Sequence, residues 1–257
     1  MKRFHMLLPA LMVMAFGAGC IKEDRDECPC RLFLDFSDVD TASVTSADIH
    51  MTSENGFEFS DEVEKRHFQD YMIMVPSKQV LLHVLSGAGH CLSNDMSVTI
   101  PYGEECPKLF GYESLINTDC EQATESIRLR KNHCVLTIQV ETDEVYPFNL
   151  VVKGNVDGYG SDLKPRAGEF SCKAVPDSSG RSVVVIPRQV DTSLALEVDD
   201  GTGIVKTFAV GESIVAGGYD WNAENLDDVT VTLDYSLSKF ALDILEWTEE
   251  YVHEVVI

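Results

Sequence analysis

Cys20 is the residue whose neighbours point most directly to covalent chemistry. Three small residues, 17–19, precede it, and a positive head at Lys2 and Arg3 leads into an apolar run over residues 6–16. This order of charge, apolar run and small residues is typical of a secretory signal peptide. The run of roughly 11 residues is too short to cross a bilayer core as a helix.

A cysteine directly after such small residues is typical of a bacterial lipobox, in which the thiol accepts a diacylglycerol before the signal is cut. The sequence therefore predicts a lipoprotein signal peptide over residues 1–19 and lipid attachment at Cys20. The usual box has Leu three residues before the cysteine, where this chain has Gly17. A plain signal peptide with an incidental cysteine is the alternative.

Six consecutive charged residues, 22–27, follow the lipid cysteine. Such a run buries too little apolar surface to fold, so residues 20–29 are predicted to be a solvated tether. Within it, Lys22, Glu23 and Asp24 resemble the surface-export signal of lipoproteins in Bacteroides-type bacteria. These three residues predict display on the outer face of the outer membrane.

Length and charge limit the possible functions. The 257 residues allow one large or two small domains, and 43 acidic against 20 basic residues give a formal net charge of −23. A body this acidic repels phosphate backbones, so we expect no nucleic-acid partner. No second stretch of the sequence is long and apolar enough for a transmembrane helix, so the acyl chains are the predicted membrane attachment.

Catalytic and metal-binding motifs are absent from the sequence, so we predict a non-enzymatic protein without cofactor or metal. Asn155, Asp157 and Asp162 lie in a Gly-rich stretch and offer oxygen ligands for Ca²⁺, but their order does not match an EF-hand. Tyr219 and Trp221 are compatible with a sugar-stacking platform, although core or edge packing is the commoner use of such a pair.

Eight cysteines are present, and lipidation of Cys20 leaves seven, an odd number. Cys28 and Cys30 are too close for an easy mutual bridge, so at least one of them could staple the N-terminal strand to the body. Cys134 and Cys172 lie in strand-like runs and are interpreted as small buried hydrophobes.

Short apolar or alternating segments separated by turn signals predict an all-β protein. Asn55-Gly56 marks a hairpin, residues 154–160 a Gly-rich turn, and residues 61–68 a helical turn or loop. Residues 240–244, the last predicted strand, also fit an amphipathic helix. The predicted strands cover residues 30–36, 48–52, 57–59, 71–75, 79–85, 96–100, 126–130, 134–140, 148–152, 169–174, 181–186, 194–198, 204–210, 229–233 and 240–244.

About fifteen strands are more than one small sandwich uses. We therefore predict two β-sandwich domains in series, an N-terminal one over residues 30–122 and a C-terminal one over residues 123–257.

The chain resembles the FimB-like fimbrium anchoring subunits of type V, fimbrillin-type pili in Bacteroides-like bacteria. The matching features are residues 19–24, Cys28-Pro29, Arg31-Leu32, the Asn55-Gly56 hairpin, and residues 129–140 as the opening of a second domain. The resemblance implies two transthyretin-like sandwiches, a lipid anchor in the outer membrane, a place at the fimbrium base, and fimbrial shaft subunits as partners. Cys30 and the number of later cysteines depart from the family.

The resemblance also implies a mode of assembly by β-strand addition. In pili of this family, shaft subunits lose an N-terminal strand by proteolysis, and the open groove accepts a strand from a neighbour. An anchor that keeps its lipid keeps that strand, so we predict that residues 31–36 stay in the chain's own first domain.

The C-terminal residues are then the candidate donor strand. Tyr251, His253, Val255 and Ile257 share one face of a strand, and the alternative is an edge strand of the second sandwich. An alternative function for the whole chain is a glycan-binding surface lipoprotein of a nutrient-uptake system.

Overall fold

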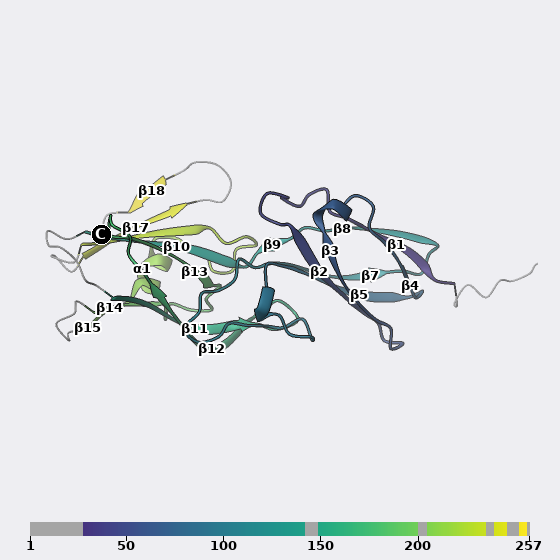
Figure 1. Ribbon diagram of the computed structural model, residues 1–257, viewed down its shortest axis with the longest axis horizontal. Coiled ribbons are helices and arrows are strands. Elements are labelled where there is room, and N and C mark those ends of the chain that lie inside the picture. The colour runs from purple at the N-terminus through teal and green to yellow at the C-terminus, as the bar shows by residue number, and fades with distance from the viewer. Residues whose placement is uncertain (1–27, 142–148, 200–204, 235–238, 246–251, 256–257) are drawn as a thin grey trace, which may run out of the picture.

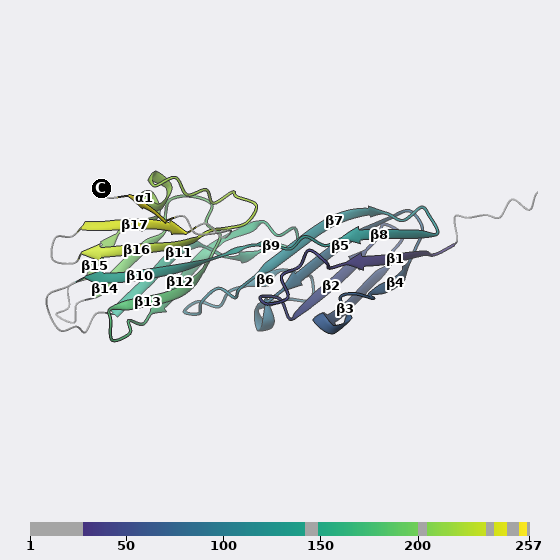
Figure 2. The same ribbon diagram turned by 90° about the horizontal axis from the view of Figure 1, so that it is seen from above.

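Two β-sandwiches follow one another along the long axis of the molecule (Figure 1). The computed structural model describes residues 28–141, 149–199, 205–234, 239–245 and 252–255. Figure 2 shows the same two units from above, with the N-terminal strands in one and the C-terminal strands in the other. The predictions of an all-β fold and of sandwiches in series are confirmed.

The strands of the first sandwich are β1 (Cys30–Asp35), β2 (Ser46–Thr52), β3 (Glu58–Glu64), β4 (Met72–Val75), β5 (Gln79–Ser86), β7 (Phe110–Asn117), β8 (Gln122–Ser126) and β9 (Arg130–Lys131). One sheet has the order β4-β1-β8, and the facing sheet has the order β3-β2-β5-β7-β9. Short 3₁₀ turns, η2 (Lys65–His67) and η3 (Gly89–Cys91), follow β3 and β5.

The second sandwich contains β6 (Val98–Thr99), β10 (His133–Glu141), β11 (Asn149–Tyr159), β12 (Pro165–Ala174), β13 (Arg181–Pro187), β14 (Ala195–Asp199), β15 (Val205–Phe208), helix α1 (Val210–Ala216), β16 (Asp228–Asp234), β17 (Lys239–Leu245) and β18 (Val252–Val255). Its sheets have the orders β13-β10-β16-β17-β18 and β12-β11-β14-β15, and β6 pairs with β11.

The two sandwiches repeat one strand topology. β1 is antiparallel to β4 and parallel to β8, and β10 is antiparallel to β13 and parallel to β16. In the facing sheets, β3-β2-β5-β7 and β12-β11-β14-β15 are antiparallel throughout. The correspondence ends at β16, because β17 and β18 extend the sheet of the second sandwich, whereas β8 is the edge strand of the equivalent sheet in the first.

Each sandwich encloses its own apolar core, but the chain crosses between them. Residues 87–109 lie between β5 and β7 in sequence and contribute buried side chains, Val98 and Leu109 among them, to the second core. Val98 pairs with Tyr159, and the Cys106 N–H donates to the Val185 carbonyl at 2.9 Å. The division into domains 30–122 and 123–257 stays a prediction. The packing shows that residues from the N-terminal range also enter the second core.

A buried ion pair also joins the sandwiches. Lys131 is the last residue of β9, and its Nζ lies 2.6 Å from Oδ1 of Asp228 at the start of β16. The Lys131 side chain is only 3% exposed, and the same carboxylate oxygen accepts the Val135 N–H at 2.8 Å. A buried ammonium requires such a partner, so Asp228 fixes the point where the chain enters the second sandwich.

His133 comes two residues after Lys131 and makes stability depend on pH. The ring is buried beside Phe110, and its Nδ1 donates to the Leu109 carbonyl at 3.0 Å. Burial lowers the pKa of His133 to about 4. Because an unfolded histidine takes up its proton near pH 6.5, the unfolded chain is favoured as pH falls from there toward 4.

We expect this single group to cost the folded state about 3 kcal/mol between pH 7 and pH 4. His133→Asn keeps a donor for Leu109 and removes the titration, so urea unfolding of both proteins isolates the effect. Relative to the wild type, the variant should gain this amount of unfolding free energy when the pH falls from 7 to 4, because only the wild type carries the titrating group. A difference that is constant across the range contradicts the assignment.

Several element predictions need correction. Residues 154–160 are not a turn, because the Gly-rich stretch continues β11, with register shifts between Gly154 and Gly158 that absorb the irregularity. Of residues 61–68, predicted as a helical turn or loop, the first part belongs to strand β3, since an edge strand exposes charged residues at no cost. The second part contains the helical turn Lys65–His67, as predicted. Residues 239–245 form a strand, so the predicted strand over residues 240–244 is confirmed and the helix alternative is wrong.

The hairpin prediction at Asn55-Gly56 is confirmed. β2 and β3 pair along their full length, and Gly56 has a φ of 84°, which glycine adopts without strain. Helix α1 was not predicted. Within the described residues, no helix is long and apolar enough to cross a membrane.

Candidate functional site

The predicted lipid cysteine and export residues lie outside the described residues. Cys20, Lys22, Glu23 and Asp24 precede residue 28, the first that the structure describes. Their roles stay predictions. The last two residues of the predicted tether, Cys28 and Pro29, are exposed and lead directly into β1.

Strand β1 is held on both sides within its own sandwich. Leu32 pairs with Ile73 of β4 and with Ala123 of β8. Alternate side chains enter the core, with Leu32 at 0% and Leu34 at 2% exposure. Each buried leucine contributes about 1.5–3 kcal/mol of transfer free energy, so the strand is an integral part of the first core.

The end of β1 is anchored by aromatic packing. Phe36 stacks on Phe68 with ring centroids 4.5 Å apart and an interplanar angle of 12°. The Leu34 N–H donates to the Tyr71 carbonyl at 3.2 Å. The groove of the first sandwich is thus filled by the chain's own residues 30–36.

The C-terminal candidate strand lies at a sheet edge. β18 is the last strand of its sheet and pairs antiparallel with β17, His253 opposite Ile244 and Val255 opposite Leu242. Tyr251 and Ile257 lie outside the described residues. Within one chain the segment therefore occupies the edge position, and its donation to a partner stays a prediction.

The aromatic pair considered as a sugar platform is buried. Tyr219 and Trp221 are each 5% exposed, and their rings meet edge to face with centroids 4.6 Å apart. The Tyr219 hydroxyl donates to the Asp227 carbonyl at 2.8 Å, and the Trp221 carbonyl accepts from Arg188. The two side chains form part of the second core and do not present a stacking face.

The oxygen ligands considered for calcium bind separate partners. Asn155 donates to Asp191 at 2.7 Å. Asp157 pairs with Arg166 at 2.9 Å, and Asp162 pairs with Lys164 at 2.7 Å. Among the described residues, no group of three or more His, Cys, Asp or Glu side chains could hold a metal ion.

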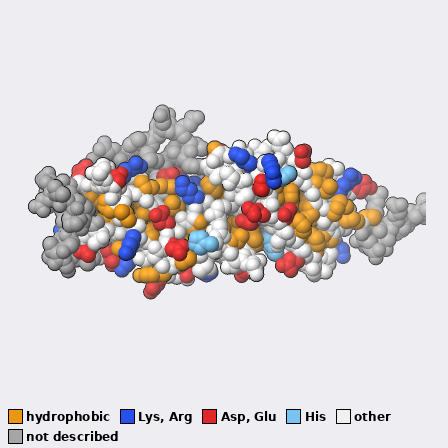
Figure 3. Space-filling model, in the orientation of Figure 1, with side chains coloured by type: hydrophobic (Ala, Val, Ile, Leu, Met, Phe, Trp, Pro, Cys, Tyr) orange, Lys and Arg blue, Asp and Glu red, His pale blue; other side chains and the backbone are white. Residues whose placement is uncertain are grey.

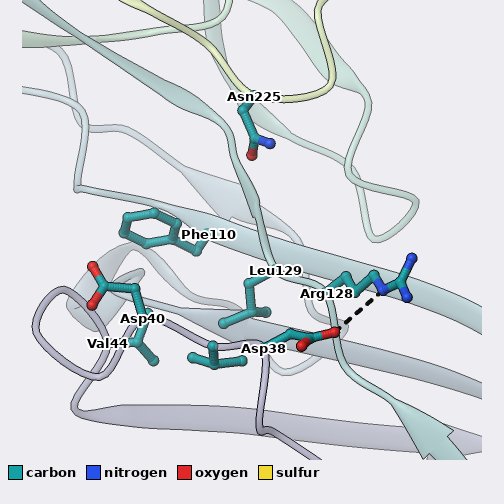
Figure 4. Close-up of a pocket in the computed structure, with 8 residues that line it drawn as sticks. Asp38, Asp40, Val44, Phe110, Arg128, Leu129 and Asn225 are labelled. Carbon is teal, nitrogen blue, oxygen red and sulfur yellow. Dashed lines mark ion pairs between the residues drawn. The ribbon is translucent and has the colours of Figure 1, made fainter. Parts of the chain in front are cut away.

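A hollow of about 270 Å³ lies at the seam between the sandwiches (Figure 4). Its polar groups are bonded within the protein: Asp38 pairs with Arg128 at 3.5 Å, and Asp40 accepts from the Ser43 hydroxyl at 2.7 Å. The Asn225 side chain accepts the Lys131 N–H at 2.8 Å. The last of these bonds crosses between the two units, since Lys131 belongs to the first sandwich and Asn225 to the second.

The surface charges are mixed. Figure 3 shows Lys and Arg side chains scattered among Asp and Glu on one face, with hydrophobic side chains gathered over each sandwich. On this face the described residues form no continuous basic track of the kind that follows a phosphate backbone.

Comparison with solved structures finds the same fold in bacterial fimbrial and candidate polysaccharide-binding proteins. A candidate polysaccharide-binding protein (DUF1812) from Bacteroides thetaiotaomicron gives a TM-score of 0.67 at 13% identity, over 90% of this chain and 99% of that one. The fimbrial anchor protein Mfa2 from Porphyromonas gingivalis gives 0.59 at 10% identity, over 89% and 100%. A C-terminally truncated form of the tip fimbrial protein Mfa3 from the same organism gives 0.51 at 7% identity, over 85% and 100%.

These similarities extend over most of each chain, so the chain shares the overall fold of the fimbrial anchor protein and of the truncated tip protein. No protein-family model matches the sequence, and no curated protein matches it.

Proposed function

We propose that this chain is a non-enzymatic surface lipoprotein that anchors a fimbrium to the outer membrane. Acyl chains on Cys20 hold it in the membrane, and Lys22, Glu23 and Asp24 direct it to the outer face. Fimbrial shaft subunits join it by β-strand addition, in which backbone hydrogen bonds give affinity and alternate side chains give specificity.

The observation that supports this proposal most is the similarity to a fimbrial anchor protein over 89% of this chain and 100% of that one. The filled first groove supports the position at the base. Because β1 is paired on both sides, the first sandwich needs no strand from a preceding subunit. A subunit whose first groove is closed in this way ends a polymer at that side.

The extension of the second sandwich supports strand donation. In the first sandwich the sheet β4-β1-β8 ends at β8, and the equivalent strand of the second sandwich is β16. β17 and β18 therefore have no counterpart in the first sandwich, which forms the same strand topology without them. An edge strand of this kind is able to leave its place and pair with a neighbouring subunit while the sandwich behind it persists.

Glycan binding by a nutrient-uptake lipoprotein is the second candidate. The observation in its favour is the similarity to the Bacteroides thetaiotaomicron protein, with a TM-score of 0.67. The burial of Tyr219 and Trp221 removes the sugar platform that the sequence offered.

Purification of the protein from detergent-solubilised outer membrane tests the proposal. We expect fimbrial subunits to co-purify, because strand addition survives mild detergent. Co-purification of an outer-membrane transporter without fimbrial subunits would contradict the anchor role and favour glycan uptake.

Deletion of residues 250–257 in the same experiment tests the donor strand. Donation predicts a folded, membrane-bound protein that no longer brings down fimbrial subunits. If the segment acts only as an edge strand, the deletion destabilises the second sandwich. Normal stability with unchanged co-purification contradicts both.

A further inference from the structure

Two cysteine side chains meet in the first sandwich, although 90 residues separate them in sequence. The Sγ atoms of Cys30 and Cys120 lie 3.8 Å apart. A disulfide bond is about 2.05 Å long, so the two sulfurs need to approach by roughly 1.8 Å. Cys120 is exposed, and its thiol also donates to the Gln122 carbonyl at 3.2 Å, a bond that closure of the bridge replaces.

The backbone fixes both cysteines in these positions. Cys30 is the first residue of β1 and pairs with Val75 of β4. The next residue, Arg31, donates its N–H to the Glu121 carbonyl at 3.1 Å and so places the Cys120 loop beside the strand.

The loop itself is held from the other side. Thr118 donates its N–H to the Lys78 carbonyl at 2.8 Å and its hydroxyl to the Pro76 carbonyl at 2.7 Å. The approach of the two thiols is therefore a property of the folded sheet.

We propose that Cys30 and Cys120 form a disulfide in the exported protein and that this bridge locks β1 into its sheet. The inference rests on the proposed export of the chain, since disulfides persist at the bacterial cell surface and in the periplasm. Cys28 is exposed two residues before the bridge and serves as an internal control. Four other cysteines are buried in the second core: Cys91, Cys106, Cys134 and Cys172.

The bond forms by thiol–disulfide exchange with a disulfide oxidant, either a thiol oxidase or oxidised glutathione. The exposed Cys120 thiolate attacks one sulfur of the oxidant, whose S–S bond breaks, and the departing thiolate takes up a proton. Cys30 then loses its proton and attacks Cys120 Sγ, which expels the second thiolate. Two thiols are oxidised, and one disulfide is reduced to two thiols.

The order of attack is set by exposure. Burial, together with the hydrogen bond to Cys120, raises the pKa of Cys30 to about 11, so its thiolate is scarce at pH 7. The mixed disulfide on Cys120 should therefore accumulate before the bridge closes, and closure should accelerate as pH rises.

The position of the bridge gives it a mechanical role. The tether from Cys20 enters the fold at Cys30, so a pull on the fimbrium reaches the first residue of β1 directly. Peeling of β1 from β4 and β8 would begin at this residue. A bond from Cys30 to Cys120 passes the force to the loop before β8 and prevents the first step.

The test combines trapping in cells with three matched variants. Free thiols are alkylated during lysis, the full-length protein is purified in detergent, and its peptides are mapped by mass spectrometry with and without reduction. We expect a linked pair of peptides containing Cys30 and Cys120, which is lost in Cys30→Ala and in Cys120→Ala and retained in Cys28→Ala. Oxidised glutathione should restore the bridge in the reduced wild-type protein, and the bridged form should melt at a higher temperature.

Alkylated Cys120 in the protein from cells would overturn the inference, and so would a linkage that disappears in Cys28→Ala. The outcome is independent of the fimbrial role. A bridge in a protein that retains no fimbriae leaves the inference standing and contradicts only the proposed function.

Discussion

Asp228→Ala is expected to destabilise the protein by about 3–5 kcal/mol, because it leaves the buried Lys131 ammonium without the carboxylate 2.6 Å away. The same change removes the acceptor of the Val135 N–H at the entry to β10. Both losses fall at the junction of the sandwiches. Urea unfolding of the purified protein measures the effect as a lower midpoint, most strongly for the second sandwich.

The matched control is an ion pair of the same type on the surface. Glu64 and Arg66 lie 3.0 Å apart, with side chains 59% and 70% exposed. Glu64→Ala should cost less than about 1 kcal/mol, because water screens the pair and solvates the remaining charge. Equal midpoints for the two variants would show that the buried pair does not hold the junction.

Cys20→Ala is expected to move almost all of the protein from the membrane fraction to the soluble fraction. The acyl chains are the proposed attachment, and two or more of them are needed for stable anchoring. Fractionation of cells, together with the mass of the N-terminal peptide, measures the change. Unchanged membrane retention and a peptide without acyl mass in the wild-type protein would contradict lipid anchoring.

Replacement of Lys22, Glu23 and Asp24 by alanine is the control for this experiment. The triple variant keeps Cys20, so it should stay lipidated and in the membrane fraction. It should resist protease shaving of whole cells, because it no longer reaches the outer face. Shaving at the wild-type rate would mean that these residues have no role in export.

Much of the fold could be predicted because alternation and turn residues act locally. The Asn55-Gly56 turn and the alternating strand 229–233 are local patterns, and both appear in the structure. Strand β7 was not predicted, because apolar residues do not alternate with polar ones along it: Leu115 is exposed beside the buried Ile116, and Pro107 stands close before the strand. The repeated topology was equally hidden, since strand order depends on pairing between distant segments and leaves no fixed sequence period.

The contacts that matter most for the site could not be predicted. Lys131 and Asp228 are nearly one hundred residues apart, and in so acidic a chain no spacing rule selects one carboxylate. The sequence indicated that Cys28 or Cys30 could bond to the body, but only the β1–β8 pairing brings Cys120 beside Cys30. For Tyr219 and Trp221 the sequence favoured core packing over a sugar platform, and the burial of both side chains in the second core confirms the favoured interpretation.

The location of fimbriae in cells carrying Cys20→Ala tests the anchor role most directly. Fimbrial protein is measured by immunoblotting on washed cells and in the medium, for the wild type and for the variant. The proposed function predicts that the variant sheds most fimbriae into the medium, attached to unlipidated protein. Fimbriae retained on the variant cells at the wild-type level would contradict it.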